Sequence, residues 1–185
     1  MEVLKVNKFK DYFQPTISLL IICLFVTGAL ALTYNITAPI IAQVTKERAN
    51  TARLLVLPDA KGGFAPFDSP LDDGIIDIYF ANDESGAVIT TRDKGFGGNI
   101  KVMTGFDNAG KITGIKLLEH KETPGLGTKV MADAYLGQYM GKSELENIDA
   151  ITGVTISSMA MYRAVDKAMK QFKKLEKFSS IGGTN

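Results

Sequence analysis

The sequence predicts an α+β fold, with a single N-terminal transmembrane helix followed by one domain in which helices pack on an antiparallel sheet. Three observations lead to this prediction. No charged residue occurs between Asp11 and Lys46, short β-rich runs separated by turn residues follow residue 74, and a long amphipathic segment closes the chain. The chain has 185 residues, of which 45% are apolar, so it is suited to one ordered domain beside an anchor.

The transmembrane helix is expected over residues 16–38, after an N-terminal cytoplasmic segment of residues 1–15. A helix over residues 17–36 would cross about 30 Å of hydrocarbon. The competing interpretation is a cleaved signal peptide, because basic residues precede the apolar run and residues 29–31 read Ala-Leu-Ala. Since the apolar run continues past that point, we favour an uncleaved anchor.

The orientation of this helix is only weakly indicated by charge. Basic residues flank it on both sides, so the positive-inside rule favours a cytoplasmic N-terminus only slightly. The flanking residues are Lys5, Lys8 and Lys10 before the helix and Lys46, Arg48 and Arg53 after it.

In the next part of the chain, the pattern of apolar residues changes from one typical of a helix to one typical of strands. Residues 39–57 are expected to form a connecting helix that begins at Pro39 and ends before Pro58. Residues 58–74 are rich in proline, glycine and aspartate and predict a loop. Turn residues then separate four β-rich runs and predict an antiparallel meander, with strands over residues 75–81, 88–91, 100–106 and 112–119.

The last long element is a predicted helix from about Ser157, as N-cap, to about residue 178. It closes a domain of residues 58–178, before a flexible tail of residues 179–185. One face of this helix is apolar and should cover the sheet, with Tyr162, Val165, Met169 and Phe172. The opposite face is basic, and we interpret it as a solvated surface more readily than as a docking patch, with Arg163, Lys167, Lys170, Lys174 and Lys177.

The composition argues against several classes of function. The 21 basic and 20 acidic residues nearly balance, which argues against a nucleic-acid binder. The chain has one cysteine, Cys23, and one histidine, His120, which excludes a disulfide framework, a thiolate iron–sulfur site and a multi-histidine zinc site. No metal site is therefore expected, and redox chemistry would need an organic cofactor.

Two glycine-containing loops are the candidates for chemistry. Residues 120–127, HKETPGLG, combine a proline with two glycines, so this loop can be tight and preformed and can present polar groups to a ligand. Residues 149–155, DAITGVT, precede the final helix, where exposed amides attract anions such as phosphate. Each loop taken alone is also compatible with an ordinary turn or an ordinary capped helix start. A GxxxxGK[ST] motif is absent, so nucleotide hydrolysis is not supported.

The two loops together resemble a known family. DAITGVT resembles the Dxx[ST]GAT signature of proteins that carry FMN in phosphoester linkage to the final threonine, and HKETPGLG resembles a second stretch of the same FMN-binding domain. With the anchor and the chain length, the resemblance is to the G subunit of Rnf-type ion-translocating ferredoxin:NAD⁺ oxidoreductases, over roughly residues 12–178. The related C subunit of the sodium-pumping NADH:quinone oxidoreductase shares this design, but chains of that family are usually longer.

The resemblance implies a set of cofactor-binding residues. Thr155 would carry FMN covalently, and Asp149, Thr152 and Gly153 would belong to the recognition signature. Val154 departs from the family alanine and adds two methyl groups close to the attachment point. The residues that match the second motif and are expected near the flavin are Glu122, Thr123, Gly125, Leu126 and Gly127.

The resemblance also implies a cellular role. The chain would be a single-pass flavoprotein of the cell (inner) membrane that relays electrons within an ion-translocating complex, without catalysis of its own. Its flavin domain would lie on the extracytoplasmic side. Its partners would be the other membrane and peripheral subunits and a flavin-transferring enzyme. The alternatives are the equivalent subunit of a sodium-pumping NADH:quinone oxidoreductase and a non-redox anchored module whose glycine loop holds a phosphorylated ligand or a partner protein.

We interpret His120 as a surface or turn residue and Cys23 as a packing residue of the anchor.

Overall fold

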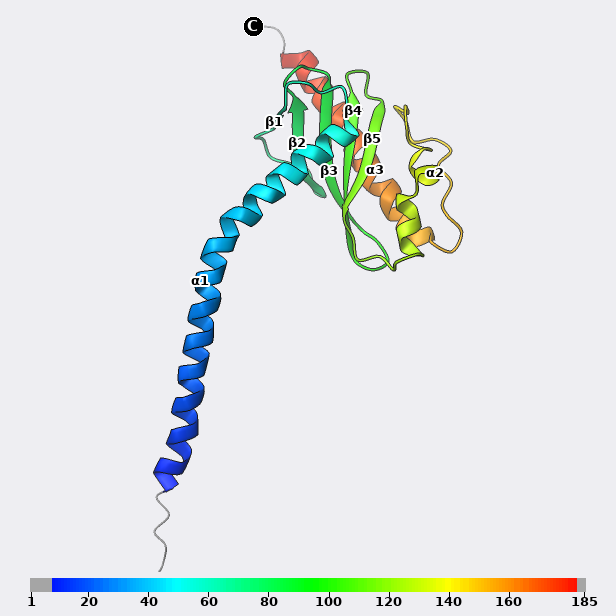
Figure 1. The fold of residues 1–185 in the computed structure, drawn as a ribbon. Coiled ribbons are helices and arrows are strands. Elements are labelled where there is room, and N and C mark those ends of the chain that lie inside the picture. Colours follow the sequence, from blue (N-terminus) through cyan, green and yellow to red (C-terminus); the bar gives the residue numbers. More distant parts are fainter. Residues whose placement is uncertain (1–7, 183–185) are drawn as a thin grey trace, which may run out of the picture. The chain divides into compact units, whose positions relative to one another are not determined.

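The fold is seen in a computed structural model, which describes residues 8–182 (Figure 1). Residues 1–7 of the predicted N-terminal segment and residues 183–185 of the predicted tail lie outside the described part. The elements are α1 (Lys8–Val56), β1 (Phe64–Pro66), β2 (Ile75–Ala81), β3 (Gly86–Lys94), β4 (Asn99–Asp107), β5 (Ile112–Glu119), the 3₁₀ helix η1 (Gly127–Met131), α2 (Asp133–Leu136) and α3 (Thr155–Gly182). The predicted α+β class is confirmed. The chain divides into two compact units, residues 1–48 and 49–185.

Helix α1 joins the predicted transmembrane and connecting helices into one continuous helix. Pro15 and Pro39 both lie inside it. A proline removes one backbone donor, and the bonds on either side can keep such a helix continuous in an apolar setting. The part Pro15–Val56 is long and apolar enough to cross a membrane. Its large apolar side chains from Ile17 to Val44 are exposed. The Thr33 hydroxyl donates to the Ala29 carbonyl oxygen at 2.9 Å, so this polar group is satisfied within the helix.

The sheet is an antiparallel meander with the strand order β1-β2-β3-β4-β5. The first and last of the four predicted strands, β2 and β5, have the predicted bounds. Strands β3 and β4 are a few residues longer than the predicted runs. Strand β1 was expected to be loop. It is three residues long, pairs only with β2 and contains Pro66, which an edge strand tolerates because it needs no donor on its open side.

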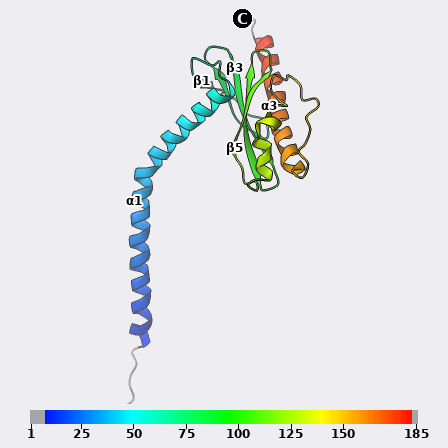
Figure 2. The same cartoon turned by 45° about the vertical axis from the view of Figure 1, so that its right-hand side comes forward.

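Helix α3 covers one face of the sheet, as its apolar stripe predicts (Figures 1 and 2). Val165, Met169 and Phe172 are buried in the main core with side chains of the sheet. Phe172 stacks on Phe106 of β4 at 5.0 Å between ring centroids. The hydroxyl of Thr91 on β3 donates to the Ala164 carbonyl oxygen of α3 at 2.9 Å, so a polar contact also fixes the helix to the sheet.

The second face of the sheet is covered by the last turns of α1. Ala52, Val56 and Leu57 form a small second core with side chains of β2, β3 and β4. Gly105 and Gly114 make this approach possible, because a Cβ atom at either position would lie 2.2–2.7 Å from the Val56 carbonyl oxygen. The sheet therefore lies between α3 and the end of α1.

The basic face of α3 forms ion pairs that its sequence did not indicate. Arg163 and Lys167 both contact the buried carboxylate of Asp93 at the end of β3, each at 2.8 Å. Lys174 contacts Asp72 at 2.8 Å, and Lys170 pairs with Asp166 of its own helix. Arg163, Lys170 and Lys174 are nevertheless exposed, so the face is solvated as expected, and the structure adds ion pairs to acidic residues distant in sequence.

Replacing Asp93 with asparagine should make the domain less stable and less sensitive to acid. Burial opposes the charged form of Asp93, but hydrogen bonds from Arg163 and Lys167 outweigh this effect, and the pKa of Asp93 is lowered. Its contribution is therefore complete above the unfolded-state pKa and is lost as the pH falls through the lower folded-state pKa. We expect the variant to lose about 2 kcal/mol of unfolding free energy at pH 7. As the pH falls below about 4, the difference in unfolding free energy between the two chains should shrink, and it should vanish below the folded-state pKa of Asp93.

Denaturant unfolding of the full chain in detergent, measured at several pH values, checks this prediction. Asp73→Asn is the control, because Asp73 is exposed in the same region. Parallel pH curves for Asp93→Asn and the unmodified chain would contradict it.

Candidate functional site

A cavity of about 300 Å³ lies where the HKETPGLG loop meets the start of α3. Its wall comes from three segments distant in sequence: the turn between β3 and β4, the loop that follows β5, and the first turn of α3. The lining residues are Phe96, Glu122, Thr123, Leu126, Gly127, Gly153, Val154, Thr155, Ile156 and Ser157.

The structure brings together seven of the ten residues singled out in the two loops. Those residues line the cavity and are Glu122, Thr123, Leu126, Gly127, Gly153, Val154 and Thr155. Thr152 and Asp149 are exposed and do not line it, and the main chain of Asp149 is held by the side chain of Gln138. Gly125 also lies outside the lining. A Cβ atom there would meet nothing within 4 Å, but its φ of +75° favours glycine.

The start of α3 differs from the predicted cap. The helix begins at Thr155, and its first turn is closed by the bond from the Ser158 amide to the Val154 carbonyl oxygen at 2.9 Å. Ser157 lies inside the first turn, so the prediction that it caps the helix is wrong. Gly153 has a φ of +79°, a left-handed conformation that places the turn before the helix and that a side chain would strain. Thr155 is exposed at this helix start.

Several buried contacts hold that first turn in place. The hydroxyl of Ser158 accepts a hydrogen bond from the Ile151 amide at 3.1 Å. The hydroxyl of Tyr135, on α2, donates to the Ser158 carbonyl oxygen at 3.0 Å and lies 2.9 Å from the hydroxyl of Tyr139. Burial raises the pKa of both tyrosines, so they stay neutral donors at physiological pH. The position of Thr155 is therefore fixed by the core beneath it.

The carboxylate of Glu122 is directed into the protein and bound at both oxygens. Glu122 is 4% exposed. Its Oε2 atom accepts a hydrogen bond from the Ser157 hydroxyl at 2.6 Å, and its Oε1 atom accepts one from the Gly97 amide at 3.2 Å. These two bonds connect the three segments that form the cavity.

Sequence reasoning did not identify Phe96, Ile156 and Ser157 as members of the site. Phe96 is 70% exposed and Ile156 is 55% exposed, and both line the same cavity. The available signal was an aromatic residue inside the glycine-rich turn Gly95–Gly98, a place where nothing in the local sequence would bury it. Exposed apolar groups beside a cavity favour a ligand with an apolar part.

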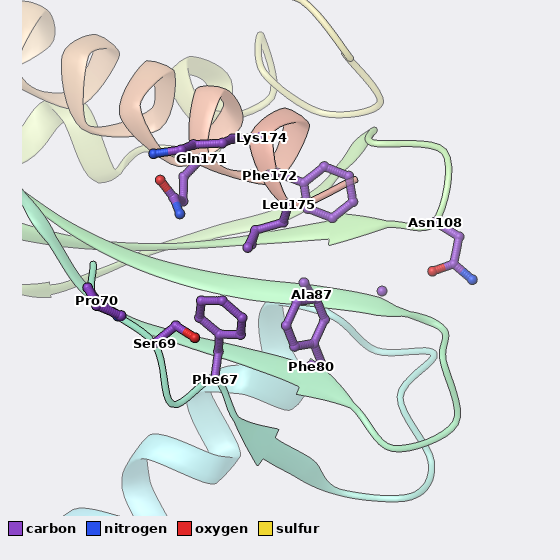
Figure 3. A pocket seen from close by; sticks show the side chains of 11 residues that line it. Phe67, Ser69, Pro70, Phe80, Ala87, Asn108, Gln171, Phe172, Lys174 and Leu175 are labelled. Carbon is purple, nitrogen blue, oxygen red and sulfur yellow. The ribbon is translucent and has the colours of Figure 1, made fainter. Parts of the chain in front are cut away.

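A second and larger cavity, of about 690 Å³, lies between α3 and β2 (Figure 3). Phe67, Phe80 and Leu175 line it, and none of the predicted site residues does. The cation at its edge, Lys174, is already paired with Asp72. We therefore assign the candidate site to the smaller cavity, where the two motifs meet, and not to the larger one.

The remaining candidate residues do not join this cavity. His120 is exposed just after β5, and Cys23 is exposed on α1. Within residues 8–182, no group of three or more histidine, cysteine or acidic side chains is arranged to hold a metal ion. The cavity combines an apolar wall with an exposed hydroxyl at a helix N-terminus. The free amides at that helix end favour an anion.

Comparison with known proteins agrees with this geometry. The family described as "FMN-binding domain" matches residues 95–170, a range that contains all ten residues of the cavity wall. FMN combines a flat ring with a phosphate, and these are the two features that the apolar wall and the helix start can receive.

Curated relatives match most of the chain. It is 32% identical to the G subunit of the proton-translocating ferredoxin:NAD(+) oxidoreductase complex of Clostridium ljungdahlii, covering 86% of this chain and 90% of that protein. It is 30% identical to the G subunit of the Na(+)-translocating ferredoxin:NAD(+) oxidoreductase complex of Acetobacterium woodii, covering 91% and 95%. Among solved structures, Shewanella oneidensis NqrC matches with a TM-score of 0.43 and 19% identity, over 66% of this chain and 73% of that one.

Proposed function

Because this chain belongs to the family of G subunits of ion-translocating ferredoxin:NAD⁺ oxidoreductase complexes, we propose that it relays electrons within such a complex through an FMN bound in the cavity at the start of α3. The observation that carries the proposal is the convergence of both motif loops on one cavity, with Thr155 exposed in its wall. The chain acts as a subunit of an oxidoreductase.

The proposal includes covalent attachment of FMN to Thr155. Its hydroxyl lies at the first residue of a 28-residue helix, where the free amides stabilise a phosphate. A phosphoester needs an activated donor, so the flavin-transferring enzyme would use a phosphoanhydride of FMN. The Thr155 oxygen would bond to the phosphorus of the FMN group as the anhydride bond breaks, and the hydroxyl proton would leave with the released phosphate group. No electron is exchanged in this step.

The protein groups around the cavity hold and shield the cofactor. Val154 packs beneath the attachment point at 6% exposure, so the valine that replaces the family alanine is accommodated in the core. Leu126, Ile156 and Phe96 offer apolar surface to the ring and keep water from it. FMN supplies the redox chemistry, and the chain sets its orientation and surroundings.

The ion path is expected to lie in other subunits. Between Asp11 and Lys46, α1 contains no ionisable side chain except that of Tyr34 and Cys23, whereas an intramembrane path needs groups that carry charge or protons. The two relatives differ in their named ion, one translocating protons and the other sodium. The other membrane and peripheral subunits of the complex are the partners that this anchored subunit requires.

We further propose that the flavin domain lies outside the cytoplasm. Protease added to intact spheroplasts should then remove residues beyond the anchor and leave a short membrane fragment. The control is the same treatment of inverted vesicles, in which the domain should be protected. Cleavage only in inverted vesicles would show the opposite orientation.

The flavin itself is tested on the chain isolated from its native host. We expect a fluorescent band after denaturing electrophoresis and an intact mass raised by one FMN less water. The rival function is a non-redox anchored module that binds a free phosphorylated ligand. A colourless chain of unmodified mass, from a host that contains the flavin-transferring enzyme, would support that rival.

A further inference from the structure

We propose that Glu122 is a positioning residue for the flavin site, and that its buried carboxylate sets the place of Thr155 by binding Ser157. We call Glu122, Ser157 and Gly97 the carboxylate clasp. The inference rests on the proposed function, since it concerns how the same site is held. It assigns Glu122 a role different from direct contact between its carboxylate and the flavin.

The clasp joins three segments at one carboxylate. The Ser157 hydroxyl donates to Oε2 at 2.6 Å, a short bond of the kind expected for a charged acceptor. The Gly97 amide donates to Oε1 at 3.2 Å. Ser157 is 2% exposed and Glu122 is 4% exposed, so solvent does not compete for these bonds. Ser157 follows Thr155 by two residues in the same helical turn, so a shift of one displaces the other.

Glycines make room for this carboxylate. A Cβ atom at Gly95 would lie 2.3 Å from Oε1 of Glu122, and one at Gly127 would lie 2.6 Å from Oε2. Both distances are shorter than any non-bonded contact, so a side chain at either position would expel the carboxylate. The glycines at positions 95 and 127 are therefore explained by the clasp. Their role is to admit Glu122, because neither has the left-handed φ that makes glycine necessary on backbone grounds.

The clasp differs from an ordinary structural ion pair. Within residues 8–182, no lysine or arginine pairs with Glu122, whereas the buried Asp93 has two such partners. The contacts of Glu122 are instead made by the loops that form the cavity. A carboxylate whose role was stability alone would have no reason to lie in the wall of the ligand site. Its location indicates that it orders the helix start before the flavin arrives.

The first test uses the chain produced without the flavin-transferring enzyme, so it does not depend on the cofactor. Glu122→Ala and Ser157→Ala should each speed hydrogen exchange of the Val154 and Ser158 amides about tenfold, since these two amides bond to the Ile151 and Val154 carbonyl oxygens. Glu122→Ala should do the same at the Gly97 amide. Glu122→Gln should keep the exchange of these backbone amides slow, because the side-chain amide of glutamine can still form a hydrogen bond with the Ser157 hydroxyl. The matched control is Glu119→Ala, which removes an exposed carboxylate three residues earlier.

The second test uses chains from the native host. Glu122→Ala and Ser157→Ala should lower the flavin-bearing fraction several-fold, and the double variant should lose no more than the worse single one, because both remove the same bond. In the molecules that still carry flavin, fluorescence anisotropy should fall, as expected for a ring held less firmly. The midpoint potential of that flavin should also shift from that of the unmodified chain.

The outcomes separate the two proposals. If the unmodified chain carries no covalent flavin, the proposed function fails, while the exchange experiment still decides whether the clasp orders residues 154–158. If the chain is flavinylated and both variants match Glu119→Ala in exchange, flavin content and potential, the clasp is overturned. Faster exchange spread over the whole domain, with flavin content and potential unchanged in the folded fraction, would show a merely structural role and would also overturn it.

Discussion

Thr155→Ala should abolish covalent flavin and leave the domain folded. Thr155 is exposed, so the substitution removes one hydroxyl from the start of α3 and little buried apolar surface. The loss should be complete, because attachment needs an oxygen atom at that position. The unfolding free energy should change by less than about 1 kcal/mol. Intact mass and in-gel fluorescence of the chain from its native host measure the first effect, and thermal unfolding measures the second.

Thr152→Ala is the matched control for this prediction. Thr152 has the same hydroxyl, three residues earlier, but it lies outside the cavity wall. Its replacement should leave most of the flavin in place. Peptide mapping that finds the flavin on Thr152, Ser157 or Ser158 would refute the assignment to Thr155.

Gly114→Ala should strongly destabilise the domain of residues 49–182. The added Cβ atom would lie 2.6 Å from the Val56 Cα atom and 2.7 Å from the Val56 carbonyl oxygen. These are backbone atoms, which cannot turn aside as the end of a flexible side chain can. The end of α1 must therefore move off the second face of the sheet. We expect a loss of about 3 kcal/mol, at the upper end of the usual cost of overpacking a core.

Denaturant unfolding of the full chain in detergent checks this value. Thr113→Val is an informative comparison, because it removes the 2.5 Å bond from the Thr113 hydroxyl to the Val56 carbonyl oxygen while keeping the side-chain shape. It should cost about 1 kcal/mol. Lys111→Ala, in the exposed turn before β5, should cost almost nothing. A Gly114→Ala variant as stable as Lys111→Ala would show that α1 does not pack on the sheet at this point.

Elements with local signals could be predicted from the amino-acid sequence alone. The charge-free stretch predicts the apolar helix, β-rich runs separated by turn residues predict β2 to β5, and the apolar stripe of α3 predicts the face that covers the sheet. The two motifs identify seven residues of the cavity wall. Each of these signals lies within a window of a few residues, because side-chain direction repeats with the period of a helix or a strand.

The pairing of distant residues, in contrast, is set by the packed fold. Nothing in the sequence pairs Asp93 with Arg163, 70 residues later, and the basic face of α3 was therefore interpreted as solvated. Ser157 has a side chain suited to capping, yet its hydroxyl bonds to Glu122, 35 residues earlier, inside the helix turn. Local propensity assigns a polar side chain to the nearest free backbone group. A buried carboxylate that needs a donor competes for the same side chain, and this competition exists only after the loops have packed together.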